Sequence, residues 1–366
     1  MSFSEVDHVM MARALQLARR GLYTTTPNPR VGCVIAAGGE VVGEGFHQRA
    51  GEAHAEVLAL NAAGTGAKDA TAYVTLEPCC HHGSTPPCTD ALLAAGVARV
   101  VAAMQDPNPL VAGKGLAALR AAGVDAECGV LGDEARELNI GFVSRMTRGR
   151  PWVRLKAAAS LDGRTALNNG RSQWITGAQA RRDGHAWRAR SCAVLTGIGT
   201  VRDDDPQLTV RHVETSRQPL RVVVDSRLET PLSGRILDGA SDGAPLLIVC
   251  AIDDSVRSAA LQARGAQVMA LPNRAGKVEL AALLAELARR GINEVLAEAG
   301  FKLNGSLLRE GCVDELLLYL APCLIGEAAQ GLFNLPELAS LDERRELRIV
   351  DLRRVGADIR IVARPV

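Results

Sequence analysis

One histidine, two cysteines and one glutamate offer the clearest chemistry in this sequence. His54 and Glu56 lie two residues apart, and Cys79 and Cys88 follow within the next 32 residues. One imidazole and two thiolates would give a zinc ion three tetrahedral ligands and leave its fourth position open to water. Bound zinc lowers the pKa of water toward about 7, so hydroxide is available at neutral pH. Glu56 could accept the proton of that water, so the residues predict a hydrolytic metal site.

The elements expected around these residues support a metal site. His54 and Glu56 fall in the first turn of a helix expected over 53–64, and Cys88 immediately precedes a helix expected over 89–96. Helix N-termini favour a thiolate over a thiol. The order matches the H-x-E and P-C-x-x-C signature of zinc-dependent base deaminases, except that eight residues separate the two cysteines. Glu77 could orient the metal loop or end a strand, and we favour the strand end.

A closed structural zinc site is the simplest alternative. Its ligands would be Cys79, Cys80, His81 and Cys88. That site would leave the His54 and Glu56 pair unexplained, so the open hydrolytic site is the better interpretation. Cys80, His81 and His82 are then expected to be loop residues near a substrate.

Composition predicts a folded protein with two domains. The chain has 366 residues, which is more than one average hydrophobic core uses, and 47% of them are hydrophobic and 23% charged. Residues 1–150 hold 13 basic and 15 acidic residues, a net charge of −2, and the remaining 29 and 26 give +3. Neither part has the basic excess of a nucleic-acid or membrane-surface protein. The longest apolar run, 316–326, is too short to span a bilayer, and the first residues do not resemble a signal peptide.

The nine cysteines and the hydrophobic pattern complete the outline. An odd cysteine number in a long chain argues against a disulfide scaffold, and we expect a cytoplasmic protein. Strand-like and helix-like segments alternate, which predicts α/β domains over 1–146 and 151–366, with the boundary at about 147–151. The last three strands are expected to be adjacent and antiparallel. The expected elements are helices over 8–20, 53–64, 89–96, 113–123, 133–149 and 279–291, and strands over 31–37, 40–46, 71–78, 99–104, 125–130, 151–160, 191–197, 220–226, 245–251, 266–272, 293–300, 316–326, 346–356 and 358–366.

Residues of the second domain suggest a nucleotide site only weakly. Gly197, Gly199 and Gly300 lie at or just after the ends of expected strands and would let the backbone approach a ligand. Arg188 and Arg211 could each bind a phosphate through two hydrogen bonds, although a lone arginine is more often a surface residue. From the residues alone, we infer an α/β domain with a possible nucleotide site.

Four stretches of the first domain resemble a known enzyme family. TPNPRVGCVI, GEGFHQRAGEAHAEVLAL, AYVTLEPCCHHGSTPPCTDAL and MQDPNPLVAGKG are similar to the deaminase half of the bifunctional riboflavin biosynthesis deaminase–reductases. In that family the long insert between the two cysteines belongs to the motif. The resemblance implies that His54, Cys79 and Cys88 bind one zinc and that Glu56 shuttles the proton. Two positions depart from the family: Cys80 replaces a usual Ser, and Ser84 replaces a usual Arg.

The second domain resembles the reductase half of the same family. SLDGRTA, SQWIT, LTGIGTVRDDDPQLTVR, VVVDS and AEAGFKLNGSLL carry this resemblance, which implies a dihydrofolate-reductase-like fold and NADPH as hydride donor. The implied cofactor contacts are Ala158, Trp174, Thr200, Asp204, Ser226, Gly300, Phe301, Lys302, Leu303, Asn304, Gly305 and Ser306. The implied substrate contacts are Ser172, Arg188, Leu208, Arg211 and Glu298. Phe301 replaces a smaller residue or Pro, and without the resemblance Trp174 would be interpreted as ordinary core.

The resemblance implies two consecutive steps of riboflavin synthesis in one chain. The N-terminal cytidine-deaminase-like α/β/α domain would hydrolyse the 2-amino group from a phosphoribosylaminopyrimidine, and the C-terminal domain would reduce the ribosyl group to ribityl. The partner is thus a small molecule, without nucleic acid or membrane, and we expect a homo-oligomer, in the form of a dimer. A nucleic-acid base deaminase with an accessory nucleotide-binding domain is the alternative enzyme, but aromatic residues are only 3% of the chain. A zinc-stabilised regulatory or flavin-sensing protein is the non-enzymatic alternative.

Overall fold

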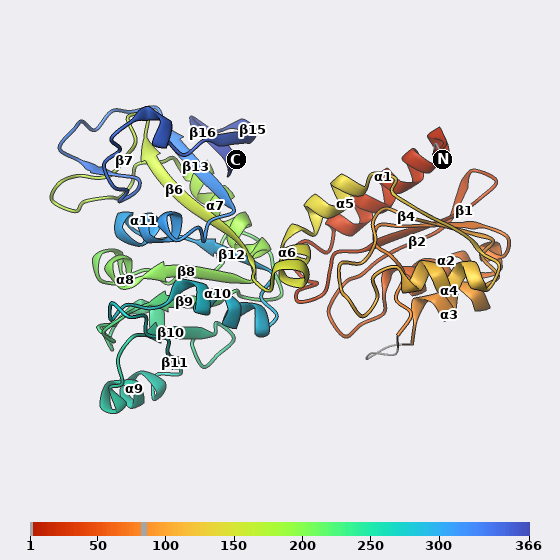
Figure 1. The fold of residues 1–366 in the computed structure, drawn as a ribbon, viewed down its shortest axis with the longest axis horizontal. Helices are drawn as coiled ribbons and strands as arrows, with labels where there is room; N and C mark the ends of the chain where they lie inside the picture. The colour runs from red at the N-terminus through yellow and green to blue at the C-terminus, as the bar shows by residue number, and fades with distance from the viewer. Residues whose placement is uncertain (1–2, 82–85) are drawn as a thin grey trace. The chain divides into compact units, whose positions relative to one another are not determined.

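Two compact units make up the chain. The computed structural model describes residues 3–81 and 86–366, and it divides into Met1–Gly149 and Arg150–Val366 (Figure 1). This division falls within the 147–151 segment where the sequence predicts the domain boundary. The first unit contains α1 (Glu5–Arg19), β1 (Gly32–Ala37), β2 (Glu40–Phe46), α2 (Ala55–Ala63), a 3-10 helix (Gly64–Ala67), β3 (Thr71–Val74), α3 (Cys88–Ala94), β4 (Arg99–Ala102), α4 (Lys114–Ala121), β5 (Asp125–Cys128), α5 (Gly132–Leu138) and α6 (Ile140–Arg148).

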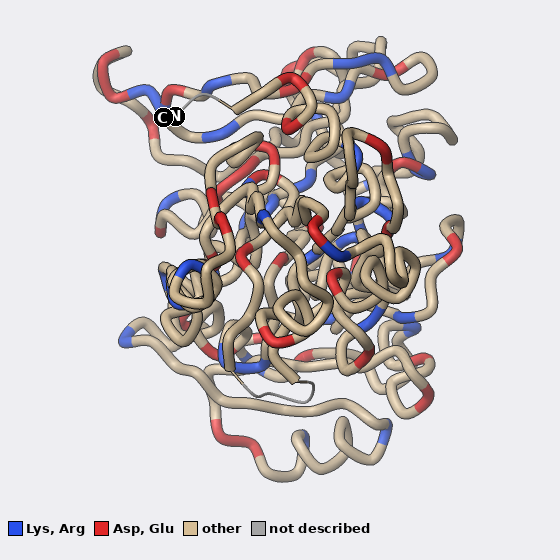
Figure 2. The backbone as a smooth tube through the Cα atoms, turned by 90° about the vertical axis from the view of Figure 1, so that its right-hand side faces the viewer, with Lys and Arg blue, Asp and Glu red and all other residues tan. Residues whose placement is uncertain are grey.

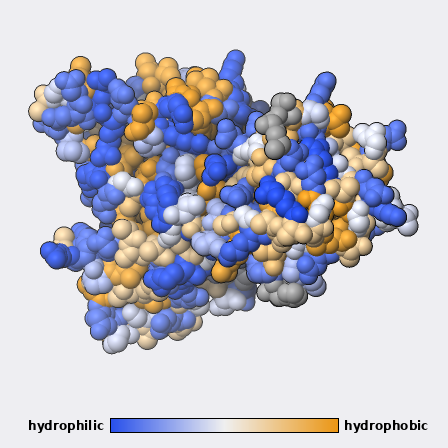
Figure 3. Space-filling model, turned by 45° about the vertical axis from the view of Figure 1, so that its right-hand side comes forward, coloured by the Kyte–Doolittle hydropathy of each residue, from blue (hydrophilic) through white to orange (hydrophobic). Residues whose placement is uncertain are grey.

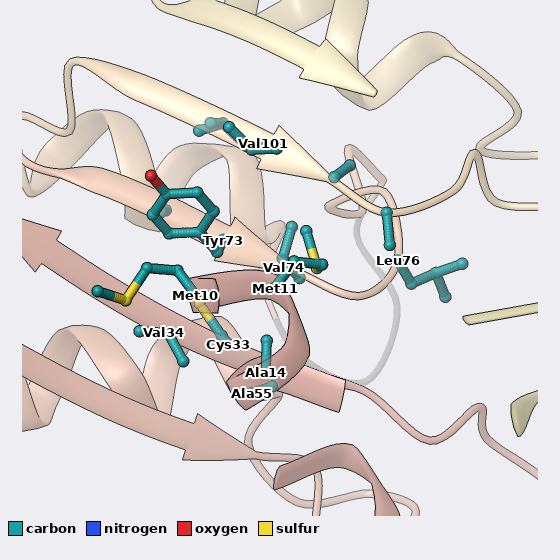
Figure 4. Close-up of a cluster of buried hydrophobic side chains, with 14 of the residues drawn as sticks. Met10, Met11, Ala14, Cys33, Val34, Ala55, Tyr73, Val74, Leu76 and Val101 are labelled. Carbon is teal, nitrogen blue, oxygen red and sulfur yellow. The ribbon is translucent and has the colours of Figure 1, made fainter. Parts of the chain in front are cut away.

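The first unit is a five-stranded sheet between two helical layers. The strand order is β2-β1-β3-β4-β5, with β1 antiparallel to both neighbours and β3, β4 and β5 parallel. Helices α1 and α5 lie on one side of the sheet, and α2, α3 and α4 lie on the other (Figure 1). Figure 4 shows part of this core: Met10, Met11 and Ala14 of α1 pack on the sheet face that carries Val34 and Tyr73, whereas Cys33 and Val74 lie on the α2 face with Ala55. The α/β/α sandwich expected from the sequence is therefore present.

The segment after β5 is two helices, so the single helix predicted over 133–149 is wrong. Asn139 separates α5 from α6 with non-helical dihedrals (φ −110°, ψ 21°). Its buried side chain accepts a hydrogen bond from the backbone N–H of Arg30 (2.8 Å) and donates one to the carbonyl of Arg30 (2.9 Å). Both backbone groups of Arg30 are satisfied by one amide, and this contact holds the break between the helices.

The second unit is built on a nine-stranded sheet. The strand order is β11-β10-β9-β8-β12-β6-β13-β16-β15. Its elements are β6 (Trp152–Ser160), β7 (Arg164–Ala166), α7 (Ala178–Arg190), β8 (Ala193–Gly197), α8 (Ile198–Asp204), β9 (Leu220–Val224), a 3-10 helix (Arg235–Leu237), β10 (Leu246–Cys250), α9 (Ser255–Gln262), β11 (Gln267–Ala270), α10 (Leu280–Arg289), β12 (Glu294–Ala297), α11 (Phe301–Arg309), β13 (Glu315–Ala321), β14 (Gln330–Gly331), a 3-10 helix (Leu341–Glu343), β15 (Leu347–Val355) and β16 (Asp358–Pro365).

Strand direction divides this sheet into two regions. The strands from β11 to β13 are parallel to their neighbours, whereas β16 is antiparallel to both β13 and β15. The expectation that the last three strands are adjacent and antiparallel is confirmed. Leucines of α10 and α11 pack on one face of the parallel region, and α8, α9 and the 3-10 helix at 235–237 pack on the other. Ligands of such sheets bind beyond the carboxyl ends of parallel strands, so that edge is where a site is expected.

Charged and apolar groups are interspersed on the surface. Figure 2 shows Lys and Arg scattered among Asp and Glu along the backbone, and Figure 3 shows hydrophilic residues spread between hydrophobic ones on the face displayed. Across residues 3–81 and 86–366, none of the helices combines the length and the apolar character needed to cross a bilayer.

Candidate metal centre and reductase site

Three separate elements bring the predicted zinc ligands together. His54 is the N-cap of α2, Cys79 lies in the loop after β3, and Cys88 is the first residue of α3. The His54 Nδ1 atom lies 3.2 Å from the Cys88 Sγ atom and 3.6 Å from the Cys79 Sγ atom, and the three ligand atoms lie within 4.8 Å of one another. Tetrahedral zinc with ordinary bond lengths separates a nitrogen from a sulfur ligand by about 3.6 Å. The three side chains therefore fit a zinc ion.

The two thiols share one hydrogen-bonded environment. The hydrogen bond from the Cys88 side chain lowers the pKa of Cys79 to about 4, and the same contact raises the pKa of Cys88 above its ordinary value. The backbone N–H of Cys88 also donates to the Cys79 sulfur at 3.4 Å. Hydrogen bonding to Cys79 raises the pKa of His54. The lowered pKa of Cys79 favours its thiolate, which is the form of cysteine that binds metals.

Glu56 is a buried carboxyl beside the metal ligands. It is the second residue of α2 and is only 4% exposed. Burial raises the pKa of Glu56 to about 7, partly offset by a hydrogen bond from its own backbone. A carboxyl group that exchanges its proton near neutral pH is suited to general acid–base catalysis. The position and chemistry of Glu56 match those of a proton shuttle next to the metal.

Glu77 orients the metal loop, so the sequence-based preference for a strand end is wrong. Strand β3 already ends at Val74, and the buried carboxylate of Glu77 accepts three backbone N–H groups. The donors are Asp106 (3.1 Å), Gly113 (2.8 Å) and Leu116 (3.1 Å). These donors belong to the loop after β4 and to the first turns of α4. Glu77 therefore fastens the loop that carries Cys79 to a second loop and a helix.

Helix α4 also packs directly on the metal loop. A β-carbon added to Gly115 would lie 2.0 Å from the carbonyl oxygen of Pro78, which no side chain can tolerate. Because Gly115 has no side chain, the N-terminal turn of α4 can contact the peptide next to Cys79. The sequence alone predicts this glycine only as part of a helix.

Several polar residues near the ligands were missed by sequence reasoning. His47 is buried, its ring packs edge-on against His54 at 5.4 Å between centroids, and its Nε2 atom lies 3.1 Å from Asn28 Nδ2. Burial lowers the pKa of His47 and raises the pKa of Asp106 to about 6. The sequence feature that could have identified His47 is the clustering of histidines before residue 83. Of the predicted loop residues, Cys80 is half-buried and His81 exposed, whereas His82 and Ser84 lie outside the described residues.

Three of the expected cofactor residues of the second unit lie beyond the carboxyl ends of neighbouring strands. Thr200 follows β8, Ser226 follows β9 and Gly300 follows β12, and these three strands are consecutive and parallel. The Thr200 hydroxyl lies 3.5 Å from the position that a β-carbon on Gly300 would occupy. The structure therefore brings three separate sequence stretches to one edge, as a dinucleotide site requires.

Helix α11 contains the longest expected cofactor stretch. Gly300 is its N-cap and no side chain caps its first N–H groups, which suits a phosphate. Phe301, Lys302, Leu303 and Ser306 lie on its partly exposed faces, whereas Asn304 and Gly305 are buried. Among the described residues, the buried Asn304 Oδ1 atom has no hydrogen-bond partner. A free helix N-terminus and an orphaned polar atom both fit a bound nucleotide.

The expected substrate residues include one buried ion pair. Arg188 donates from Nε and Nη2 to the carboxylate of Glu298, and from Nη1 to the carbonyl of Thr209 (3.2 Å). The hypothesis that Arg188 binds a phosphate through two hydrogen bonds is not what the structure shows, because Glu298 already occupies that edge of the guanidinium. Lys156, which the sequence did not single out, lies 3.6 Å from the same carboxylate. Arg211 donates to the side chain of Gln207 at 3.1 Å.

The remaining expected contacts lie on exposed or half-buried segments, except Leu208, which is 3% exposed and packs in the core with Val201 and Val223. Ser172 donates to Asp204 at 3.1 Å, which joins an expected substrate contact to an expected cofactor contact. Trp174 is 70% exposed with the Arg181 guanidinium 4.5 Å from its ring centre, so the alternative of an ordinary core tryptophan is wrong. Ala158 is half-buried on β6.

Comparison with known proteins assigns both halves of the chain. Residues 4–104 match the family model of the cytidine and deoxycytidylate deaminase zinc-binding region, and residues 151–361 match that of the RibD C-terminal domain. The chain is 49% identical to the riboflavin biosynthesis protein RibD of Escherichia coli (strain K12), over 96% of this chain and 98% of that protein. Among solved structures, Acinetobacter baumannii RibD is similar with a TM-score of 0.91 at 44% identity, over 99% of both chains. A deaminase/reductase of Thermotoga maritima gives a TM-score of 0.86 at 32% identity, also over 99% of both chains.

Fold, site and similarity together define a zinc-binding deaminase domain joined to a reductase domain in one enzyme. The chain belongs to the RibD family of bifunctional deaminase–reductases of riboflavin biosynthesis. The expected fold class is confirmed: a cytidine-deaminase-like domain is followed by a dihydrofolate-reductase-like reductase domain. The two alternatives, a nucleic-acid deaminase and a regulatory zinc protein, leave the match to the RibD C-terminal domain unexplained.

Proposed function

We propose that this chain performs two consecutive reactions on one small molecule. Residues 1–146 would hydrolyse the 2-amino group of 2,5-diamino-6-(5-phosphoribosylamino)pyrimidin-4(3H)-one. Residues 151–366 would then reduce the ribosyl side chain of 5-amino-6-(5-phosphoribosylamino)uracil to ribityl with NADPH. The observation that carries the proposal is the set of three ligand atoms within 4.8 Å beside buried Glu56, in a chain that also contains the reductase domain. The full-length similarity to RibD proteins supports the same substrates.

In the deaminase domain, His54, Cys79 and Cys88 would hold one zinc per chain. When bound there, zinc would lower the pKa of water so that hydroxide is present at neutral pH. Glu56 would take one proton from the attacking water and deliver it to a ring nitrogen, and would then move the second proton of that water to the departing amine. The water oxygen bonds to the ring carbon as the carbon–nitrogen bond breaks, and ammonia leaves. The pKa of about 7 at Glu56 supports both halves of this transfer.

In the reductase domain, the chain would align cofactor and sugar. NADPH would supply the hydride. The proposed cofactor contacts are Ala158, Trp174, Thr200, Asp204, Ser226 and the stretch from Gly300 to Ser306, and the proposed substrate contacts are Ser172, Arg188, Leu208, Arg211 and Glu298. The shared strand edge and the Ser172–Asp204 hydrogen bond support this assignment. With Arg188 bound to Glu298, Arg211 is the better candidate for the substrate phosphate.

We also propose that the chain forms a homodimer through β15. This strand is the edge of the nine-stranded sheet, and four apolar side chains on it are exposed. They are Leu347, Ile349, Val350 and Leu352. A long apolar edge strand is a template for pairing with another chain, so a partner copy is the simplest cover. The nine free cysteines support a reducing, cytoplasmic location.

Selective removal of zinc tests the two-site proposal. The full chain is treated with a chelator, and ammonia release from the diaminopyrimidine and NADPH oxidation on the deaminated uracil are followed separately. Ammonia release should stop and return with added zinc, while NADPH oxidation continues. Single-stranded RNA serves as the alternative substrate and should release no ammonia. Loss of both activities on chelation, or ammonia release from RNA alone, would contradict the proposal.

A further inference from the structure

Arg221 is a fully buried arginine that the proposed mechanism does not use. It is the second residue of β9, and its guanidinium donates to three carbonyl oxygens: those of Ile236 (2.7 Å), Gln207 (3.2 Å) and Ala244. Among the described residues no carboxylate accepts a hydrogen bond from it, and its Nε atom has no partner. Burial lowers the pKa of Arg221 to about 10. The protein therefore keeps a cation in its interior at an energetic cost.

A second buried arginine shows what a structural ion pair looks like in this domain. Arg154 on β6 is also buried, but it lies between the carboxylates of Glu294 and Glu315. Its charge is balanced by neighbouring strands of the same sheet. Arg221 instead donates to backbone carbonyls of three other segments, which are two loops and the 3-10 helix at 235–237. Its contacts thus fix chain segments relative to β9.

One of those segments is the 205–211 loop, which contains two proposed substrate contacts. The loop has no helix or strand, and side chains hold its backbone in place. Three contacts hold the loop besides the one from Arg221. The Asp205 carboxylate accepts from the N–H of Arg235 (2.8 Å), and the N–H of Arg211 donates to His185 Nδ1 (3.3 Å). The Gln218 side-chain amide accepts from the N–H of Val210 (2.7 Å) and donates to its carbonyl (3.2 Å).

The loop backbone is also strained. Asp205 (φ 41°) and Leu208 (φ 56°) both adopt left-handed backbone conformations that residues other than glycine rarely adopt. Such conformations persist only where surrounding contacts enforce them, and they cluster at functional sites. Gln207, whose carbonyl Arg221 holds, lies between the two strained residues. The contact is therefore placed where it can enforce both of them.

Two further hydrogen bonds connect this anchor to the proposed substrate groups. The Gln207 side chain accepts from the Arg211 guanidinium at 3.1 Å, so the position of Gln207 sets that of Arg211. The carbonyl of Thr209 accepts from Arg188, the partner of Glu298. A shift of the loop would displace both cationic groups of the proposed substrate site.

We propose that Arg221 is a positioning residue of the reductase, which holds the 205–211 loop so that the backbone of Leu208 and the side chain of Arg211 meet the pyrimidine substrate. The inference rests on the proposed function, because only there are these two residues substrate contacts. Arg221 acts through the loop and touches neither substrate nor cofactor. It is therefore expected to affect binding of the pyrimidine more than binding of NADPH.

The test replaces Arg221 in the full chain by Met, which fills similar space without donors, and by Lys, which retains the charge and fewer donors. Steady-state NADPH oxidation gives kcat and the KM values for the deaminated uracil and for NADPH, and ammonia release reports the first domain. Arg221→Met should raise the KM for the uracil at least tenfold, since a misplacement of about 1 Å can cost on the order of 100-fold. Arg221→Lys should give an intermediate KM. The KM for NADPH and ammonia release should stay within about twofold.

Val222→Ala is the matched control, because Val222 is the next residue of β9, fully buried, and points to the opposite face. It should lower the melting temperature without changing the KM for the uracil. If Arg221→Met changes no KM, or only as Val222→Ala does, the inference is wrong. If Arg221→Met does not fold, an unchanged KM in Arg221→Lys overturns the inference and a raised KM supports it. A wild-type chain that oxidises no NADPH on the uracil contradicts the proposed function instead.

Discussion

Replacing Glu77 by Gln tests whether the metal site depends on a carboxylate that never touches the metal. The Oε2 atom accepts two of the three backbone N–H groups and the Oε1 atom accepts the third, from Leu116. The amide oxygen of Gln would keep the first two hydrogen bonds, and losing the negative charge weakens them by about 1 kcal/mol in total. The amide NH2 group would then face the N–H of Leu116, which would have no acceptor. That unsatisfied buried donor costs about 2 kcal/mol more. We expect the deaminase domain to lose about 3 kcal/mol of unfolding free energy.

The same substitution should weaken zinc binding, because the carboxylate fixes the loop that carries Cys79. Residues that orient metal ligands typically change metal affinity 10–100-fold when replaced, and we expect about tenfold. Competition with a chromogenic chelator measures the affinity, and ammonia release should fall with it while NADPH oxidation on supplied uracil is unchanged. Glu127→Gln is the control, since Glu127 pairs with Arg99 in the same domain. Equal zinc affinity in Glu77→Gln and Glu127→Gln would refute the reasoning.

Four further substitutions probe the first domain. Gly115→Ala should push the Pro78 peptide away and lower zinc affinity, measured by the same competition; unchanged affinity would show that the 2.0 Å approach is relieved elsewhere. Cys88→Ala should lose the zinc while Cys80→Ser keeps it, as metal analysis would show, and the reverse result would exclude the ligand assignment. Arg99 holds the pKa of Asp7 well below its usual range, so the pair stabilises the fold above about pH 4 and this contribution fades as pH falls further. Asp7→Asn should therefore cost about 2 kcal/mol at pH 7 and progressively less below pH 4, and a pH-independent difference in denaturant unfolding would contradict this.

Local sequence patterns predicted most of the metal site. The spacing of His54, Glu56, Cys79 and Cys88 identifies the residues that the structure brings together, because each lies at the start of a helix or in a short loop after a strand. Alternating hydrophobic periods likewise predicted the strands of both large sheets and most helices of the first unit, but of the five helices in the second unit they predicted only α10 and missed α7, α8, α9 and α11. These features can be identified from one sequence because they depend only on residues a few positions apart.

Long-range contacts were the part that the sequence could not show. The break between α5 and α6 depends on Asn139 meeting Arg30, 109 residues earlier in the chain. The role of Glu77 depends on backbone donors 29 to 39 residues later, and a backbone N–H has no sequence signature. In the second domain, Arg188 resembles a phosphate ligand until Glu298 is placed beside it. In each case, the partner is set by the tertiary fold.

The most direct test of the two-reaction proposal follows both products in one reaction. The full chain with zinc, NADPH and the diaminopyrimidine should release one ammonia for each NADPH oxidised, with ammonia appearing first. Glu56→Gln keeps the size of the side chain but cannot cycle a proton, and general acid–base catalysis is worth about 10²–10⁴-fold. That variant should retain zinc, release almost no ammonia and oxidise no NADPH on the diaminopyrimidine, yet reduce supplied 5-amino-6-(5-phosphoribosylamino)uracil at the wild-type rate. NADPH oxidation on the diaminopyrimidine without ammonia release, or normal ammonia release by Glu56→Gln, would contradict the proposal.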